Sequence, residues 1–310
     1  MQRLHLLKSF LFCLLVSGSI HAAEGEDEGH PLGSIPLRTI GPALTSGRIA
    51  DFAFHPEHWQ HFYVAVASGN GWKTENNGIT WQPIFENEGS YERGVVELDP
   101  SNPSTIWLGT GENNSQRSVG FGDGVYKSVD GGKSWNNMGL KDSGHISMIR
   151  IHPEDSDVVW VAAQGPLWNS GGDRGLYLTR DGGISWSRIL EIDEDTGVNE
   201  FVMHPEDPDI IVASSYQRRR HVWTLINGGP GSGIHKTTDG GQSWAKVSKG
   251  LPKGDQGRIG LAMAPSSPNV IYAIIEADEK EQGVYRSTDF GQSWEKRSDH
   301  MTSSPQYYNE

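Results

Sequence analysis

The octapeptide SVDGGKSW at residues 128–135 decides the fold, because the chain repeats it. Three close copies are TRDGGISW (179–186), TTDGGQSW (237–244) and STDFGQSW (287–294), and TENNGITW (74–81) is a looser one. The Asp or Asn at the third place recurs at spacings of 54, 51, 58 and 50 residues. Repeats of this length are typical of propellers and solenoids.

Each repeat carries the signals of four short β-strands. In the third repeat these are HISMIRIHP (145–153), VVWVAAQG (158–165), GLYLTRD (175–181) and SWSRIL (185–190). No helical period lies between them. Four strands per repeat predict an all-β fold: a β-propeller of four-stranded antiparallel blades, with five complete blades between residues 36 and 310.

The two ends of the repeat region indicate a partial propeller. The segment near residues 37–42 resembles a fourth, outer strand that no other three strands precede. The chain stops at SSPQYYNE (303–310), where a sixth first strand would begin. We therefore expect further C-terminal blades, giving seven or more in the intact protein. The alternative is a five-bladed ring with a spare N-terminal strand.

The residues of the octapeptide suit a tight turn between the third and fourth strands. Its Asp can accept backbone N–H groups as Asx turns do, its Gly permits positive φ, and its Trp offers a large apolar surface. Asn at the third place of the looser copy suits an Asx turn but could not act as a general base. The structural residues are Asn76, Trp81, Asp130, Trp135, Asp181, Trp186, Asp239, Trp244, Asp289 and Trp294.

The N-terminus reads as a secretory signal peptide over residues 1–22, followed by a flexible segment at 23–35. Its apolar run, SFLFCLLVSGSI (9–20), is too short for a transmembrane segment. Cys13 is the only cysteine, so the mature chain has no disulfide. Removing Arg3 and Lys8 from 26 basic residues leaves 24 against 39 acidic ones, which argues against a nucleic-acid partner. We expect an exported bacterial protein, periplasmic, at the cell surface or extracellular.

The connections between second and third strands vary greatly in length, whereas the other turns of each blade are short. The long ones are residues 109–124, 164–175 and 214–233. Variable insertions on one face of a propeller usually mark the binding face, which we call the long-loop face. The candidate ligand-binding residues on it are Asn113, Asn114, Gln116, Arg117, Trp168, Arg174, Tyr216, Gln217, Arg218, Arg219, Arg220, His221 and Trp223.

Three consecutive arginines, Arg218–Arg220, are unusual in so acidic a chain. Arginine beside aromatic residues suits capture of a carboxylate or stacking on a ligand. Alternatively, these arginines pair with loop carboxylates and hold the long loops in place. The sequence leaves both possibilities open.

The octapeptide resembles the Asp-box of bacterial-neuraminidase-type repeats. Together with GTGENNSQRSVGFGDGVYKS (109–128) and SSYQRRRHVWTLINGGPGSG (214–233), it makes the chain similar to exported bacterial Asp-box proteins of the sortilin-like class, which are often labelled glycosyl hydrolases. The resemblance implies the propeller fold but little about function, because relatives with this repeat do unrelated things.

A glycoside hydrolase would require two carboxylates at a defined separation. Glu112 and Asp173 are weak candidates for such a glycosidase pair. In xyloglucanase-type enzymes, which this chain resembles, a catalytic Asp follows the second strand of the first blade, and Ser68 stands at that place here.

The sequence predicts neither a metal site nor a cofactor. We expect a binding or scaffold module that recognises a peptide, protein or glycan on the long-loop face. A glycoside hydrolase acting on the same face is the alternative.

Overall fold

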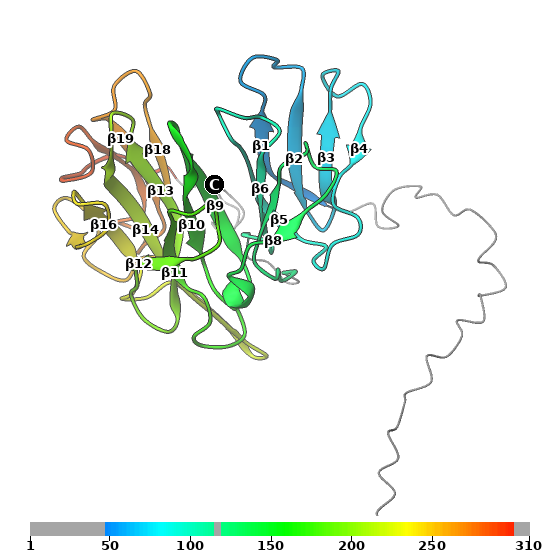
Figure 1. The fold of residues 1–310 in the computed structure, drawn as a ribbon. Coiled ribbons are helices and arrows are strands. Elements are labelled where there is room, and N and C mark those ends of the chain that lie inside the picture. The colour runs from blue at the N-terminus through cyan, green and yellow to red at the C-terminus, as the bar shows by residue number, and fades with distance from the viewer. Residues whose placement is uncertain (1–46, 115–118, 301–310) are drawn as a thin grey trace, which may run out of the picture. The chain divides into compact units, whose positions relative to one another are not determined.

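A computed structural model describes residues 47–114 and 119–300, all of them within one structural unit. They form five antiparallel sheets (Figure 1). In each sheet four strands pair in chain order, and one sheet carries an additional strand that pairs with its second strand. The signal peptide, the N-terminal segment, the strand expected near residues 37–42 and residues 301–310 lie outside the described residues. No helix in the described part is long and apolar enough to cross a membrane.

Each sheet is one blade, and the blades follow one another along the chain. Their strands are β1 (Arg48–Phe54), β2 (Phe62–Ala67), β3 (Asn70–Thr74) and β4 (Gln82–Pro83) in blade 1; β5 (Arg93–Leu98), β6 (Ile106–Thr110), β7 (Val125–Ser128) and β8 (Asn136–Asn137) in blade 2; β9 (Ile146–His152), β10 (Asp155–Ala163), β11 (Gly175–Thr179) and β12 (Ser187–Leu190) in blade 3; β13 (Thr196–His204), β14 (Asp207–His221), β15 (Thr224–Asn227), β16 (Gly233–Thr237) and β17 (Ala245–Val247) in blade 4; β18 (Ile259–Met263), β19 (Ile271–Ile275), β20 (Gly283–Ser287) and β21 (Glu295–Ser298) in blade 5. One 3₁₀ helix, η1 (Lys141–Ser143), joins blades 2 and 3.

The first strands of successive blades contact one another: β1 meets β5, β5 meets β9, β9 meets β13 and β13 meets β18. Apolar residues of facing blades fill the space between them. Between blades 2 and 3, for example, Val95 and Trp107 pack against Ile149 and Val161. Blades 2, 3 and 4 therefore bury apolar side chains against the blade on either side, as a propeller requires. The predicted all-β propeller of four-stranded antiparallel blades is confirmed.

The octapeptides form the turns between third and fourth strands and satisfy their own hydrogen bonds. In blade 2, Asp130 Oδ1 accepts bonds from the Ser134 N–H (2.9 Å) and from the Ser128 hydroxyl (2.8 Å). In blade 1, Asn76 Oδ1 accepts the Thr80 N–H (2.9 Å), so Asn replaces Asp in the same turn.

Two octapeptide tryptophans also tie their blade to the preceding one. Trp135 Nε1 donates to the Ile84 carbonyl of blade 1 (2.7 Å), and Trp186 Nε1 donates to the Met138 carbonyl of blade 2 (2.8 Å). These indoles therefore act between blades as well as within the hairpin.

Replacing Asp289 with alanine tests what the turn contributes. Hydrogen bonds from the Ser293 hydroxyl and N–H outweigh partial burial and lower the pKa of Asp289 to about 2. Losing these bonds is expected to reduce the free energy of unfolding by about 1 kcal/mol, as loss of a capping side chain does. Urea unfolding measures the change. Asp289→Asn is the matched control and is expected to cost less, as Asn76 suggests; equal losses in both variants would contradict this.

In the first strand of several blades, a backbone N–H group donates a hydrogen bond to a side chain of the preceding blade. Asp51 Oδ2 accepts the Val96 N–H (3.1 Å), and Glu200 Oε2 accepts the Leu261 N–H (2.6 Å). Met148 Sδ occupies the same place in its repeat and accepts the Phe201 N–H (3.3 Å). These bonds cap N–H groups on an edge strand that has no further strand beside it.

Blade 4 differs from the sequence expectation. Residues 214–233 were expected to form a long loop, but β14 continues to His221 and pairs with an added strand, β15. The result is a hairpin that extends from the blade and turns at Val222 and Trp223. Its polar sequence, YQRRRH, has no apolar alternation, which is why the strand signal ended too early.

Candidate functional site

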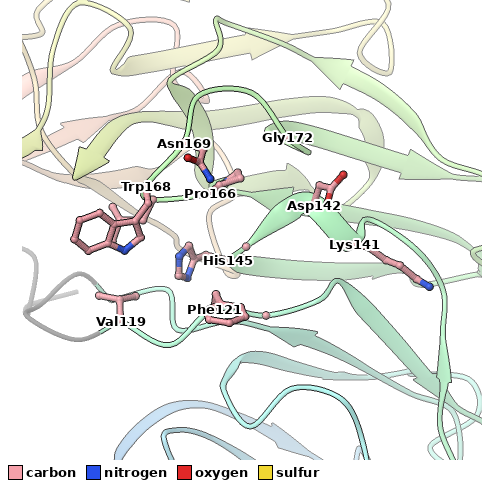
Figure 2. A pocket seen from close by; sticks show the side chains of 12 residues that line it. Val119, Phe121, Lys141, Asp142, His145, Pro166, Trp168, Asn169 and Gly172 are labelled. Carbon is pink, nitrogen blue, oxygen red and sulfur yellow. The ribbon is translucent and has the colours of Figure 1, made fainter. Parts of the chain in front are cut away.

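A pocket of about 460 Å³ opens on the long-loop face between blades 2 and 3. Figure 2 shows His145 between Trp168, from the blade 3 loop, and Phe121, from the blade 2 loop. Trp168 is 52% exposed and Phe121 is 80% exposed, so both rings are open to a ligand. The other lining residues are Val119, Gly122, Lys141, Asp142, Gly144, Pro166, Leu167, Asn169 and Gly172.

His145, just before β9, forms the buried floor of this pocket. Burial lowers the pKa of its imidazole well below the usual value, and the positive charges of Arg218 and Arg174 act in the same direction. A hydrogen bond to the backbone of Glu112 opposes the shift without reversing it. Its Nδ1 atom is buried and has no hydrogen-bond partner among the described residues.

Residues Glu112–Asn114, from the blade 2 loop, meet side chains from all the other blades; we call them the hub. The Asn113 carbonyl accepts Gln164 Nε2 of blade 3 (3.3 Å) and Arg218 Nη1 of blade 4 (3.4 Å). Asn114 Oδ1 accepts Arg258 Nη1 of blade 5 (2.9 Å).

The first blade reaches the hub through Arg48, whose guanidinium pairs with the Glu112 carboxylate. Burial raises the pKa of Glu112, while the hydrogen bond and charge of Arg48 lower it. The structure therefore brings four candidates together in the hub: Glu112, Asn113, Asn114 and Arg218.

The three consecutive arginines have different partners because side chains alternate along a strand. Arg218 is buried and also donates to Gln164 Oε1. Arg219 pairs with Asp195 (2.7 Å) and donates to the Ser170 hydroxyl. The guanidinium of Arg220 lies 5.9 Å from the ring centre of Trp168, within cation–π range.

Arg174 holds the blade 3 loop closed. Its Nε and Nη atoms donate to backbone carbonyls of Gly171, Gln164 and Asn169 at 2.9, 2.7 and 2.8 Å, and also to Pro166. The side chain is buried. Of the two roles left open for Arg218–Arg220, the pairing of Arg219 with Asp195 favours loop support. Arg174 likewise supports a loop through its bonds to backbone carbonyls.

The remaining candidates on blade 4 lie along the hairpin. Tyr216 is buried, and its hydroxyl donates to Asn227 Oδ1. Gln217 Oε1 accepts the Gly231 N–H (2.9 Å). At the tip, Trp223 is 82% exposed and stacks on His221 with ring centres 5.3 Å apart. Candidates Gln116 and Arg117 lie outside the described residues.

The candidate carboxylates occupy different surroundings. Glu112 is fully buried against Arg48, whereas Asp173 is partly exposed and its Oδ2 accepts the Asp142 N–H (3.0 Å). Ser68, at the place of the xyloglucanase aspartate, donates its hydroxyl to Glu92 (2.9 Å). No group of His, Cys, Asp and Glu suited to a metal ion occurs in residues 47–114 and 119–300.

Sequence reasoning missed His145, Phe121, Gln164 and Arg258. His145 and Gln164 sit at ends of strands and carry no motif. Their positions could have been marked only by noting polar residues where strands reach the long-loop face.

A family model described as "Sortilin, neurotensin receptor 3" (Sortilin-Vps10) matches residues 176–309. Over 120 residues the chain is 32% identical to vacuolar protein sorting/targeting protein 10 of Colletotrichum graminicola, a match that covers 36% of this chain and 6% of that protein. The C-terminal part of this β-propeller is therefore similar to the sortilin family.

Xyloglucanases are also similar to this propeller. Xyloglucanase Xgh74A of Acetivibrio thermocellus is 25% identical over 245 residues, covering 69% of this chain and 26% of the relative. Among solved structures, the GH74 xyloglucanase of Xanthomonas campestris superposes with a TM-score of 0.58 at 18% identity, over 81% of this chain and 38% of that one. An ancestral GH74 enzyme gives a TM-score of 0.62 at 18% identity, over 86% and 33%. The chain thus spans about a quarter of the length of the curated xyloglucanase relative, and the structural likeness concerns the fold alone.

Proposed function

We propose that this propeller is a carbohydrate-binding module of an exported protein, and that the ligand lies in the pocket between Trp168 and Phe121. The proposal is carried by the exposed aromatic rings of Trp168 and Phe121, which lie on either side of the buried imidazole of His145. Aromatic rings that are apolar on the face and fixed by few torsions make effective recognition surfaces. The names of the xyloglucanase relatives support a glucan over a peptide or protein as the first ligand to test.

The polar groups of the pocket also suit an uncharged ligand. Asn169 offers an amide donor and acceptor, and Lys141 and Asp142 bring charges of opposite sign from η1. The arginines Arg174 and Arg219 are engaged with backbone carbonyls and with Asp195. A sugar ring needs stacking surfaces and neutral hydrogen-bonding groups, which this pocket supplies.

Replacing Trp168 with alanine tests the function. Calorimetric titration with xyloglucan oligosaccharides is expected to show binding by the unaltered chain and at least about tenfold weaker binding by Trp168→Ala, as for a buried anchor residue. Trp59→Ala is the matched control, because Trp59 is 62% exposed in the turn between β1 and β2, away from the long-loop face. No binding by the unaltered chain, or equal effects of both changes, would contradict the proposal.

Hydrolysis is the second candidate function. Asp142 lines the pocket, and its backbone N–H binds the Asp173 carboxylate (3.0 Å), so the Asp173 carboxylate lies beside the segment that forms this wall of the pocket. A reducing-sugar assay on the same oligosaccharides distinguishes the functions. Release that disappears in both Asp142→Asn and Asp173→Asn would favour a glycosidase.

A further inference from the structure

The blade 3 loop that carries Trp168 is attached to the extended part of β14 on both sides of this residue. Just before Trp168, the Leu167 carbonyl accepts the backbone N–H of Arg220 (2.8 Å). Just after it, the Ser170 hydroxyl accepts a hydrogen bond from Arg219 Nη1. The loop therefore cannot move away from the blade 4 hairpin without breaking a contact on each side of Trp168.

The hairpin also contacts the indole ring of Trp168 itself. The Arg220 guanidinium lies over this ring, 5.9 Å from its centre, and Arg220 is not among the described residues that line the pocket. It therefore approaches the ring from outside the pocket, whereas Figure 2 shows the indole at the pocket's border. The ring is 52% exposed, which agrees with one covered side and one open side. A cation this close to a ring centre is attracted to it, so the contact favours this orientation of the side chain.

The orientation of Trp168 matters because an aromatic side chain that is ordered before binding avoids an entropic cost in the complex. A tryptophan side chain turns about two torsions, and an exposed one on a loop loses this freedom when a ligand stacks on it. The backbone contact at Leu167 and the contact at Ser170 hold the loop but leave these torsions free. The Arg220 guanidinium acts on the ring and restricts them.

We infer that Arg220 is a positioning residue of the carbohydrate site: its guanidinium holds the Trp168 ring so that the side toward the pocket is ready to stack on a sugar ring. This inference rests on the proposed carbohydrate-binding function and gives blade 4 a part in a site built by blades 2 and 3. Arg220 acts on the ligand only through Trp168, because it contacts the ring from outside the pocket.

A double-mutant cycle tests whether Arg220 acts through Trp168. In calorimetric titration with xyloglucan oligosaccharides as the probe, Arg220→Ala is expected to bind about fivefold more weakly, because one side chain must then be ordered on binding. Arg220→Lys keeps a cation near the ring and is expected to bind within about twofold of the unaltered chain. In the Trp168→Ala background, Arg220→Ala is expected to cause no further loss. Arg180→Ala, at an exposed arginine in the octapeptide turn of blade 3, is the matched control and should bind as the unaltered chain does.

A second measurement uses the free protein and does not need the probe. In the chain labelled with fluorotryptophan, the ¹⁹F resonance that disappears in Trp168→Phe is assigned to Trp168. Arg220→Ala is expected to shift this resonance, because the cation over the ring is removed, whereas Arg180→Ala should leave it in place. If Arg220→Ala fails to fold, Arg220→Gln takes its place in both experiments, since it also removes the charge and keeps the backbone bond to Leu167.

The outcomes separate this inference from the proposed function. If the unaltered chain does not bind the probe, the proposed function fails, and the ¹⁹F resonance alone decides whether Arg220 holds the ring. If it binds, and Trp168→Ala weakens binding while Arg220→Ala does not, the function stands and the role of Arg220 is wrong. Equal losses from Arg220→Ala with and without Trp168 would also overturn the inference, because Arg220 would then act without the ring. An unchanged ¹⁹F resonance in Arg220→Ala overturns it as well.

Discussion

Replacing Arg218 with alanine is expected to lower the free energy of unfolding by about 3 kcal/mol, because hydrogen bonds to charged groups contribute strongly and the deleted side chain is buried. Arg218 joins the Asn113 carbonyl of blade 2 to Gln164 of blade 3. Without it, both acceptors lose a donor inside the protein, where water cannot easily replace it. Urea unfolding at pH 7 measures the loss.

Arg219→Ala is the matched control for this experiment. Arg219 is the next residue along β14, but its side chain contacts Asp195 and Ser170 near the surface. Its loss is expected to cost about 1 kcal/mol or less, as for a partly exposed ion pair. A cost for Arg218→Ala no larger than that of Arg219→Ala would show that the hub does not join the blades energetically.

The second large effect is a pH dependence that centres on Glu97 in β5. Burial raises the pKa of Glu97 to about 7; the charge of Arg150 lowers it, and the neighbouring Asp51 adds to the rise. Glu97 Oε2 of blade 2 and Arg150 Nη1 of blade 3 lie 3.1 Å apart. Because the folded protein binds this proton more tightly than the unfolded chain does, the stabilisation is fully present below about pH 4.5 and is lost as pH rises through about 7.

We therefore expect the stability of Glu97→Gln relative to the unaltered chain to depend on pH. The variant should be more stable at pH 8, relative to the unaltered chain, than it is at pH 5, and the change in this difference in free energy of unfolding should be about 1–3 kcal/mol. Urea unfolding at several pH values measures it. Burial lowers the pKa of His235 to about 4, so this residue makes the folded protein more stable as pH rises. Because His235 is present in both proteins, its effect cancels when the variant is compared with the unaltered chain. Glu295→Gln, at an exposed outer strand, is the control and should leave the pH profile unchanged. Identical profiles for Glu97→Gln and the unaltered chain would contradict the account.

The fold was predictable because the octapeptide is a local device. Its hydrogen bonds span two to four residues, so each copy marks a turn without knowledge of the rest of the chain. The strands that flank it follow from alternation and from the regular spacing. The predicted strands of blade 3 differ from the observed ones by no more than three residues at either end.

The site was only partly predictable because its contacts are long-range. Arg258 and Asn114 are 144 residues apart, and Arg218 and Asn113 are 105 apart. No local sequence pattern indicates that these residues are in contact. The three arginines looked alike in the sequence, and only the extension of β14 to His221 assigns them to opposite faces. The exposed Trp168 was identified from its loop, whereas the lone His145 carried no recognisable signal.

The acceptors on the inner strands give the propeller a direction. Asp51 Oδ2 and Glu200 Oε2 each accept a backbone N–H group of the blade that follows. A defect at Asp51 should therefore appear first as faster amide exchange at Val96, one blade downstream. In a nearest-neighbour description of repeat stability, loss of the Asp51 side chain weakens the interface between blades 1 and 2 and leaves the later interfaces unchanged.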